Sequence, residues 1–355
     1  MLRAGLRSTK TSGFLSQKDY NAGHILKGIH VSRLEDVQVN KVNVWLNHLG
    51  SWLREEGFSH DEQDGTSRIG YRRPDDRVYQ VSPNVTLKLC HSSSAFFQSR
   101  ERILRYDIFL SVERRRPFNF NGAFRWIEAL RALLHFARLR PVKPTKITFE
   151  RFDSTFEPGG KSHSREIELF SGAIAASIES DPLYFDFVFT FDDVKDRFAE
   201  LCSKWFRFYV EQREAIGCYM TTVYTSLTCE VRLICLTQAL EAFHQRRFHP
   251  APKSEDAHFV NRIKSLCRRH GTRMNNLVGD IEAFAISVRD SRHYYTHHDP
   301  SIRQNGHVGS GSKLTLMTYH LQYLFRLCVL SEFGLEADRH SMLSRQVPGR
   351  IIEFY

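Results

Sequence analysis

The chain has 355 residues, a length that fits two domains, and 41% of them are hydrophobic, which is enough to build ordinary cores. This composition excludes a disordered chain. The formal net charge of +10 at pH 7 favours phosphate-bearing partners, but by itself it also fits a soluble basic protein that binds no nucleic acid.

No stretch of about 18 uncharged apolar residues occurs, so we expect no membrane-spanning helix. The basic N-terminus lacks the apolar segment of a secretory signal, and we therefore expect a cytoplasmic location. The seven cysteines are an odd number, and no two of them have Cys-x-x-Cys spacing. That pattern predicts buried small hydrophobic side chains rather than a disulfide framework or a zinc site.

Short segments of the first half alternate or run apolar and are rich in β-branched and aromatic residues, as strands are. The expected strands are Ile25–Val31, Val37–Trp45, Arg77–Leu89, Arg105–Val112, Lys146–Phe152 and Tyr184–Phe189. Turn signals occur at Ser59–Asp61, Arg73–Asp76 and Glu157–Gly160. One helix is expected over Asn121–Arg138, where apolar residues recur at helical spacing. The pattern predicts a β-sandwich-like domain over residues 1–190.

Two short patterns in this half carry a family resemblance. Gly23-His24 stands before a hydrophobic strand, and Leu49-Gly50-Ser51-Trp52-Leu53 has the form Leu-x-x-Trp-Leu. In both patterns the chain resembles the ApeA N-terminal domain. The family domain is usually longer at its N-terminus, so the resemblance implies that residues 1–190 are an ApeA-type β-rich domain truncated at its start.

From about Asp192 onward the apolar residues change to helical period. Asp192 and Asp193 are expected to cap a helix that runs through Phe198 and Trp205 to Tyr209. Further helices are expected over Thr221–Arg246, Glu255–Arg269, Asn275–His297 and Ser312–Phe333, the last of them ended by Gly334. Short connections favour an antiparallel bundle, so residues 191–355 are predicted to be all-α and the whole chain α+β.

The run Arg292-His293-Tyr294-Tyr295-Thr296-His297-His298-Asp299 lies at the end of one expected helix. Arg292 is a permanent cation whose donors suit a phosphate, and His297 can give or take a proton near neutral pH. Cleavage of RNA needs these two functions, because one group must neutralise the phosphate and another must move the proton of the 2′-hydroxyl. His293 and His297 share a helix face, whereas Arg292 must swing its long side chain toward them.

This run, with the helices around it, resembles the HEPN superfamily, which is marked by an Arg-x(4–6)-His motif with a polar residue directly after the arginine. Within that superfamily it is similar to the ApeA-like HEPN proteins of bacterial defence. Those proteins show a run like RNYYTHYD where this chain has RHYYTHHD, so the family has Asn in place of His293. The resemblance implies that residues 191–355 are a HEPN helical domain.

The resemblance also implies a function. It points to a metal-independent endoribonuclease of an anti-phage or abortive-infection system, which needs no cofactor and acts on RNA, with transfer RNA as one plausible substrate. It implies a homodimer in which two motif helices form one composite cleft. The N-terminal domain would then respond to a phage-derived trigger or hold the nuclease inactive.

Each motif residue has an expected role. His297 is expected to act as general base or acid, Arg292 to bind the scissile phosphate, and His293 to orient the phosphate or the imidazole. Glu241 lies in Leu240-Glu241-Ala242-Phe243-His244, which is similar to a Leu-Glu-x-hydrophobic-His stretch of ApeA-like HEPN domains. Its carboxylate is expected either to pair with Arg292 or hold His297 in one tautomer, or to be a solvated helix carboxylate.

The same residues also fit other functions. A non-catalytic RNA-binding or regulatory HEPN dimer would use the same bundle without the chemistry. His298 offers a second acceptable spacing from Arg292. The histidines of the motif would also be candidate metal ligands, but no Glu follows His293 in a His-Glu-x-x-His arrangement.

Three other segments have the composition of phosphate or RNA sites. Gly306–Lys313 is glycine-rich like a phosphate loop, but it lacks the required Gly-Lys-Ser/Thr, so we expect a connection between helices. The basic clusters Arg114–Arg116 and Arg268–His270 either guide RNA or form solvated faces.

Overall fold

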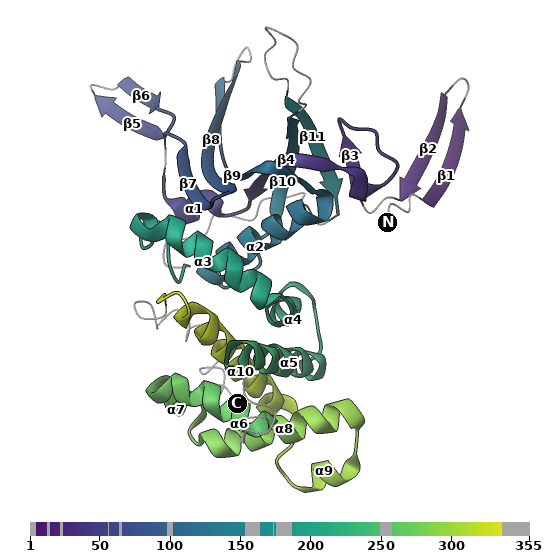
Figure 1. The fold of residues 1–355 in the computed structure, drawn as a ribbon, viewed down its shortest axis with the longest axis vertical. Helices are drawn as coiled ribbons and strands as arrows, with labels where there is room; N and C mark the ends of the chain where they lie inside the picture. The colour runs from purple at the N-terminus through teal and green to yellow at the C-terminus, as the bar shows by residue number, and fades with distance from the viewer. Residues whose placement is uncertain are drawn as a thin grey trace. The chain divides into compact units, whose positions relative to one another are not determined.

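A computed structural model describes residues 5–12, 15–21, 24–55, 57–63, 66–97, 102–152, 164–172, 174, 187–248 and 258–335. The chain divides into two compact units: the first holds residues 1–137, 142–184 and 190–204, and the second holds 138–141, 185–189 and 205–355. The first unit is built mainly on strands and the second on helices (Figure 1). The predicted α+β class, with a β-rich half before a helical half, is confirmed.

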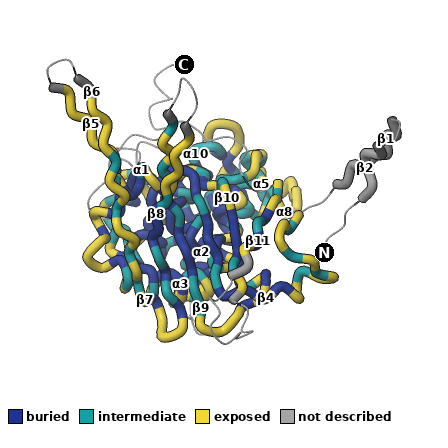
Figure 2. Tube along the Cα trace, turned by 90° about the horizontal axis from the view of Figure 1, so that it is seen from above, coloured by how far each residue is buried: buried dark blue, intermediate teal, exposed yellow. Residues whose placement is uncertain are grey.

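One antiparallel sheet dominates the first unit, with the strand order β3-β11-β10-β4-β9-β8-β7. Its strands are β3 His24–Lys27, β4 Gln38–Leu46, β7 Arg77–Ser82, β8 Val85–Phe97, β9 Arg102–Asn119, β10 Pro144–Phe152 and β11 Ser164–Ser171. Two separate hairpins join β1 Gly5–Ser12 to β2 Leu15–Asn21 and β5 Phe58–Gln63 to β6 Thr66–Tyr71. Figure 2 shows that the central strands are largely buried, whereas the described part of the β5–β6 hairpin is mostly exposed.

The hydrophobic core of this unit lies between the sheet and helix α2, Phe120–Arg138. The ring of Phe120 lies 5.6 Å from that of Phe149 on β10, and both side chains are buried. A short helix, α1 Leu49–Leu53, carries Trp52, whose ring lies 5.6 Å from the Phe191 ring. The Leu-x-x-Trp-Leu pattern is therefore a core element of the first unit.

Several sequence predictions in this unit are confirmed. The expected strands Val37–Trp45 and Lys146–Phe152 correspond to β4 and β10, and the helix over Asn121–Arg138 corresponds to α2. The strand expected over Arg105–Val112 is the middle of the longer β9. The strand expected over Ile25–Val31 already ends at Lys27, because Gly28 takes a φ of +105° and a Cβ there would lie 2.5 Å from the carbonyl oxygen of Glu166.

Other strand predictions are wrong. Arg77–Leu89 is not one strand but the hairpin β7–β8, whose turn holds Pro83 and Asn84. The turn expected at Ser59–Asp61 lies inside β5. Of the strand expected over Tyr184–Phe189, residues 187–189 are not extended in a strand and the others lie outside the described residues, as does the turn at Glu157–Gly160.

The helices of the second half are α3 Phe198–Glu211, which begins in the first unit, α4 Arg213–Tyr224, α5 Cys229–Phe248, α6 Phe259–Arg269, α7 Gly271–Val278, α8 Ile281–His297, α9 Pro300–Gln304 and α10 Gly311–Ser331. The rings of Tyr219 on α4 and Phe325 on α10 stack at 4.8 Å, and Phe243 on α5 lies 6.0 Å from Phe325. Arg326 donates from Nε to the Tyr219 hydroxyl at 2.8 Å. These contacts pack α4, α5 and α10 around a common hydrophobic core.

Two helix predictions are wrong because each joins two helices. Thr221–Arg246 is interrupted between α4 and α5, where Thr225 is extended, and Asn275–His297 is interrupted at Gly279 between α7 and α8. The first helix begins at Phe198 rather than next to Asp193, whose carboxylate accepts hydrogen bonds from the backbone and hydroxyl of Thr190 instead. The last helix is confirmed as α10, and Gly334 beyond it takes a φ of +63°.

None of the helices in the described ranges combines the length and the apolar character that crossing a membrane requires. The seven cysteines are free thiols, and Cys90, Cys202, Cys267 and Cys328 are buried.

Candidate active site

Helix α8 carries the Arg292–His297 motif, and its two ends are defined by local sequence. Asp280 caps its N-terminus by accepting hydrogen bonds from the backbone of Glu282 at 2.8 Å and of Ala283 at 3.1 Å. At the other end His298 takes a left-handed conformation with a φ of +54°, and its N–H bonds the Tyr294 carbonyl at 2.6 Å. The motif therefore occupies the last turns of a helix with fixed ends.

The sides of α8 differ in burial. Ala285, Val288 and Ser291 are buried in the helical unit, whereas His293 and His297 are exposed. The rings of His293 and His297 lie 4.9 Å apart and nearly perpendicular, as expected for residues one helical turn apart. Two imidazoles are thus presented together on an open helix surface.

Arg292 is positioned between these sides, with a side chain that is 31% exposed. Its Nη1 lies 2.9 Å from Oε2 of Glu241 on α5, and its Cζ lies 4.7 Å from the centre of the Phe259 ring on α6. The other carboxylate oxygen of Glu241 accepts a hydrogen bond from Nη1 of Arg262 at 3.0 Å. One carboxylate on α5 therefore holds an arginine from α6 and an arginine from α8.

The two arginines of this cluster differ in exposure. Two guanidinium cations share the one carboxylate of Glu241, so this carboxylate is divided between Arg262 and Arg292. Arg262 is the more buried arginine, with a side chain 12% exposed. The more exposed Arg292 is consequently the part of the cluster that an incoming anion would meet.

The residues after the motif form the short helix α9, whose Arg303 donates from Nη1 to the Tyr294 hydroxyl of α8 at 3.3 Å. Asp299 caps α9 by accepting a hydrogen bond from the Ser301 backbone at 2.9 Å. The Ser301 hydroxyl and backbone, followed by the charges of His293 and His297, hold the pKa of the Asp299 carboxyl below its ordinary value. A carboxylate therefore stays ionised close to the two histidines.

The segment Gly306–Lys313, which the sequence predicts to be a connection, bonds the buried side of α8. Gly309 donates its N–H to the Ser291 hydroxyl at 2.8 Å and accepts from the Tyr295 hydroxyl at 2.8 Å. His307 lies 3.1 Å from Asp290, whose pKa is raised by burial but lowered overall by the bonds to Arg289 and His307. These bonds fix how α8 is rotated and so which residues it exposes.

Arg292, His293 and His297 all lie on α8, where the two imidazole rings contact each other. Arg292 contacts Glu241 on α5, the fourth predicted site residue. Sequence reasoning missed Arg262 and Phe259, which belong to no motif. The sequence signal that could have pointed to them is the amphipathic pattern of α6, in which basic residues recur among apolar ones. His298 is exposed at the helix end, with its ring 5.9 Å from that of Tyr294.

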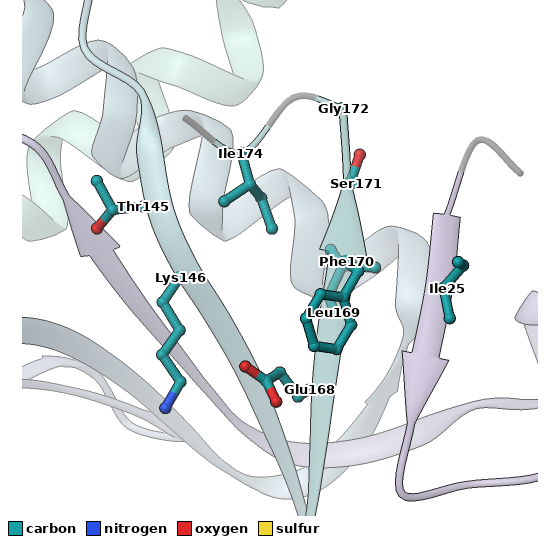
Figure 3. Close-up of a pocket in the computed structure, with 9 residues that line it drawn as sticks. All are labelled: Ile25, Thr145, Lys146, Glu168, Leu169, Phe170, Ser171, Gly172 and Ile174. Atoms are coloured by element: carbon teal, nitrogen blue, oxygen red, sulfur yellow. The ribbon is translucent and has the colours of Figure 1, made fainter. Parts of the chain in front are cut away.

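Within the described ranges, no group of three or more His, Cys, Asp or Glu side chains is placed to hold a metal ion. A cavity of about 370 Å³ occurs in the first unit, at the β10, β11 and β3 end of the sheet (Figure 3). Ile25 and Phe170 line it and are both about half exposed. None of the predicted site residues lines this cavity.

Comparisons with known proteins give two matches along the chain. A family model for ApeA N-terminal domain 1 matches residues 4–205, and a family model for Apea-like HEPN matches residues 234–339. No curated protein and no solved structure matches the chain. Glu241, Arg262 and the whole α8 motif lie inside the second matched region.

Proposed function

The chain belongs to the ApeA-like HEPN proteins, and from this membership we propose that it is a metal-independent endoribonuclease. The observation that carries the proposal is the Arg292 guanidinium, held by Glu241, on the helix whose exposed end presents His293 and His297. A positioned cation and a titratable imidazole are the groups that internal cleavage of RNA requires.

In the proposed reaction His297 takes the proton of the 2′-hydroxyl as the 2′-oxygen forms a bond to phosphorus. The bond between phosphorus and the 5′-oxygen breaks, and this oxygen takes up a proton from a protonated histidine or from water. Arg292 stabilises the charge on the phosphate oxygens, and His293 orients the phosphate or the His297 ring. The products are a 2′,3′-cyclic phosphate and a 5′-hydroxyl.

The proposal includes a homodimer. His293, Thr296 and His297 form an exposed strip at the end of α8, so the same strip of a second chain can approach it around a two-fold axis. Two arginines and two histidines would then surround one phosphate. This agrees with the dimerisation that is common among HEPN domains.

The biological setting follows from the family. We propose that the enzyme acts in bacterial defence against phage, that its substrate is cellular RNA with transfer RNA as a candidate, and that the N-terminal domain responds to a phage-derived trigger. Expression in bacteria should then arrest growth when the trigger is present.

The test is incubation of the full chain with total bacterial RNA in the presence of EDTA. The wild type should yield discrete fragments ending in 2′,3′-cyclic phosphate, and Arg292→Ala and His297→Ala should each lower the rate at least about 100-fold without loss of fold. His258→Ala, an exposed histidine of the same unit, is the matched control and should cleave normally. Full activity in either motif variant contradicts the proposal.

One observation favours a second candidate, the non-catalytic RNA-binding or regulatory dimer. In this structure Arg292 is already engaged by Glu241 and lies over the Phe259 ring, so a phosphate must compete for it. A protein of this kind would retard RNA in a gel-shift experiment and never shorten it, with or without a trigger.

A further inference from the structure

Strand β9 departs from its neighbour β4 near one end of the large sheet. The register pairs Lys41 with Glu113 and Val39 with Phe118, so β4 supplies Asn40 alone opposite residues 114–117 of β9. An excess of residues on one strand makes a bulge, which turns side chains out of the regular alternation. Residues 114–116 of this bulge are all arginine.

The bulge borders a cavity of about 380 Å³, which lies within the size range of small-molecule sites. Arg114 and Arg115 line it from β9, and the β7–β8 turn lines it with Pro83 and Asn84. The remaining lining residues are Asn40, Gln80, Thr86 and Glu113. All of these belong to the first unit.

The arginines of this cavity are not neutralised. Within the described residues, no carboxylate forms an ion pair with Arg114, Arg115 or Arg116, and Nε of Arg114 is buried without a hydrogen-bond partner. The Cζ of Arg114 lies 5.7 Å from the centre of the Phe118 ring, which limits where the guanidinium can turn. Arg115 is exposed and lines the cavity, so its guanidinium donors are available to a ligand.

The acidic residue of the cavity does not offset this charge. Glu113 lies 2.8 Å from Nζ of Lys88 and 3.8 Å from Nζ of Lys41, so its carboxylate is shared by two lysines. The rest of the wall is neutral and polar: Thr86 donates to the Gln80 side chain at 3.2 Å, and the Gln80 amide donates to the Val85 carbonyl at 3.2 Å. Arginines on one side of the cavity can bind a phosphate, and the amides and hydroxyls of the rest of the wall can hydrogen-bond a polar group attached to that phosphate.

We propose that this cavity between the β9 bulge and the β7–β8 turn binds the phosphate of a nucleotide. The nucleotide is either free or the phosphorylated end of an RNA chain, since both present the same group. The site lies in the N-terminal unit and does not depend on the nuclease activity proposed for α8. It gives the N-terminal domain a ligand of its own.

The test is isothermal titration of the full-length protein with inorganic phosphate, AMP and ATP. A fourth ligand is a short RNA with 2′-O-methyl groups, which cannot be cleaved, carrying or lacking a 5′-phosphate. Arg115→Gln should weaken binding about tenfold or more, because a charge-assisted hydrogen bond to the phosphate is lost. Arg116→Gln removes the same charge from the next residue, which does not line the cavity, and should change affinity less than about threefold.

The outcomes separate the possibilities. Binding of AMP or ATP that Arg115→Gln weakens and Arg116→Gln does not supports a free nucleotide, and binding of the phosphorylated RNA alone supports an RNA end. Equal loss in both variants means diffuse attraction to a basic surface and overturns the proposal, as does failure of all four ligands to bind. If both variants unfold at the same midpoint temperature as the wild type, misfolding is excluded as the cause of any loss of affinity.

Discussion

At the scale of single residues, Glu241 is the group on which the geometry of the candidate site depends. Its carboxylate bonds Arg262 through one oxygen and Arg292 through the other. Glu241→Gln keeps the shape but leaves two cations facing an amide, so Arg292 loses its fixed position. We expect the rate of RNA cleavage to fall about 10- to 100-fold, because small displacements of catalytic groups are costly. Single-turnover cleavage measures this loss.

A matched control exists on the motif helix itself. Glu282 near the start of α8 also pairs with a cation, Lys264, but its side chain is half exposed and lies at the other end of the helix from His297. Glu282→Gln should cleave at the wild-type rate. Glu241→Asp, with a shorter carboxylate, should recover part of the activity. Wild-type cleavage by Glu241→Gln would show that Arg292 needs no such support.

The candidate site was predictable from sequence where short motifs hold its residues, one on α8 and, for Glu241, one on α5. Arg292, His293 and His297 lie within one helix end, so a motif of the right spacing identified them. Arg262 reaches Glu241 from another helix, through a contact that only the packing of α5, α6 and α8 creates. What the sequence could not supply is this tertiary pairing.

At the scale of elements, errors in the predicted helices and strands came from short interruptions of a continuous pattern. Thr225 and Gly279 each divide a long apolar periodicity, because an extended residue and a glycine with a φ of +70° redirect the chain. Pro83 divides the run Arg77–Leu89 into β7 and β8 in the same way. Periodicity reports which face is apolar, but it does not report where a single turn reverses the chain.

The N-terminal cap of α8 leads to a prediction at this scale. Asp280 satisfies the backbone N–H groups of Glu282 and Ala283, which otherwise have no partner in the helix. Asp280→Ala should lower the free energy of unfolding by about 1 kcal/mol. Urea denaturation, monitored by circular dichroism, measures this loss of stability.

The cap and the chemistry can be separated in the same experiment. Asp280→Asn keeps an acceptor oxygen and should stay within about 0.5 kcal/mol of the wild type. Because the cap and His297 lie at opposite ends of α8, both variants should cleave RNA normally while folded. Equal stability of the Ala variant and the wild type would mean that packing of the buried side alone fixes the start of this helix.

At the scale of the whole molecule, the exposed strip of His293, Thr296 and His297 raises the question of assembly. One chain presents one Arg292 and one histidine pair on an open surface, which excludes little water from a bound phosphate. A second copy across a two-fold axis would enclose the phosphate and strengthen each charge that contacts it. Activity should therefore belong to the dimer.

Mixing of chains tests this dependence. A large excess of His297→Ala chains, left to exchange with wild-type chains, converts most wild-type protomers into mixed dimers with one histidine missing from the shared cleft. The cleavage rate per wild-type chain should fall severalfold or more. An equal excess of Arg292→Ala should act in the same way, because it removes a cation from that cleft, whereas an unrelated protein should have no effect. If wild-type chains keep their full rate in every mixture and sediment as monomers, each protomer cleaves alone and the composite cleft is wrong.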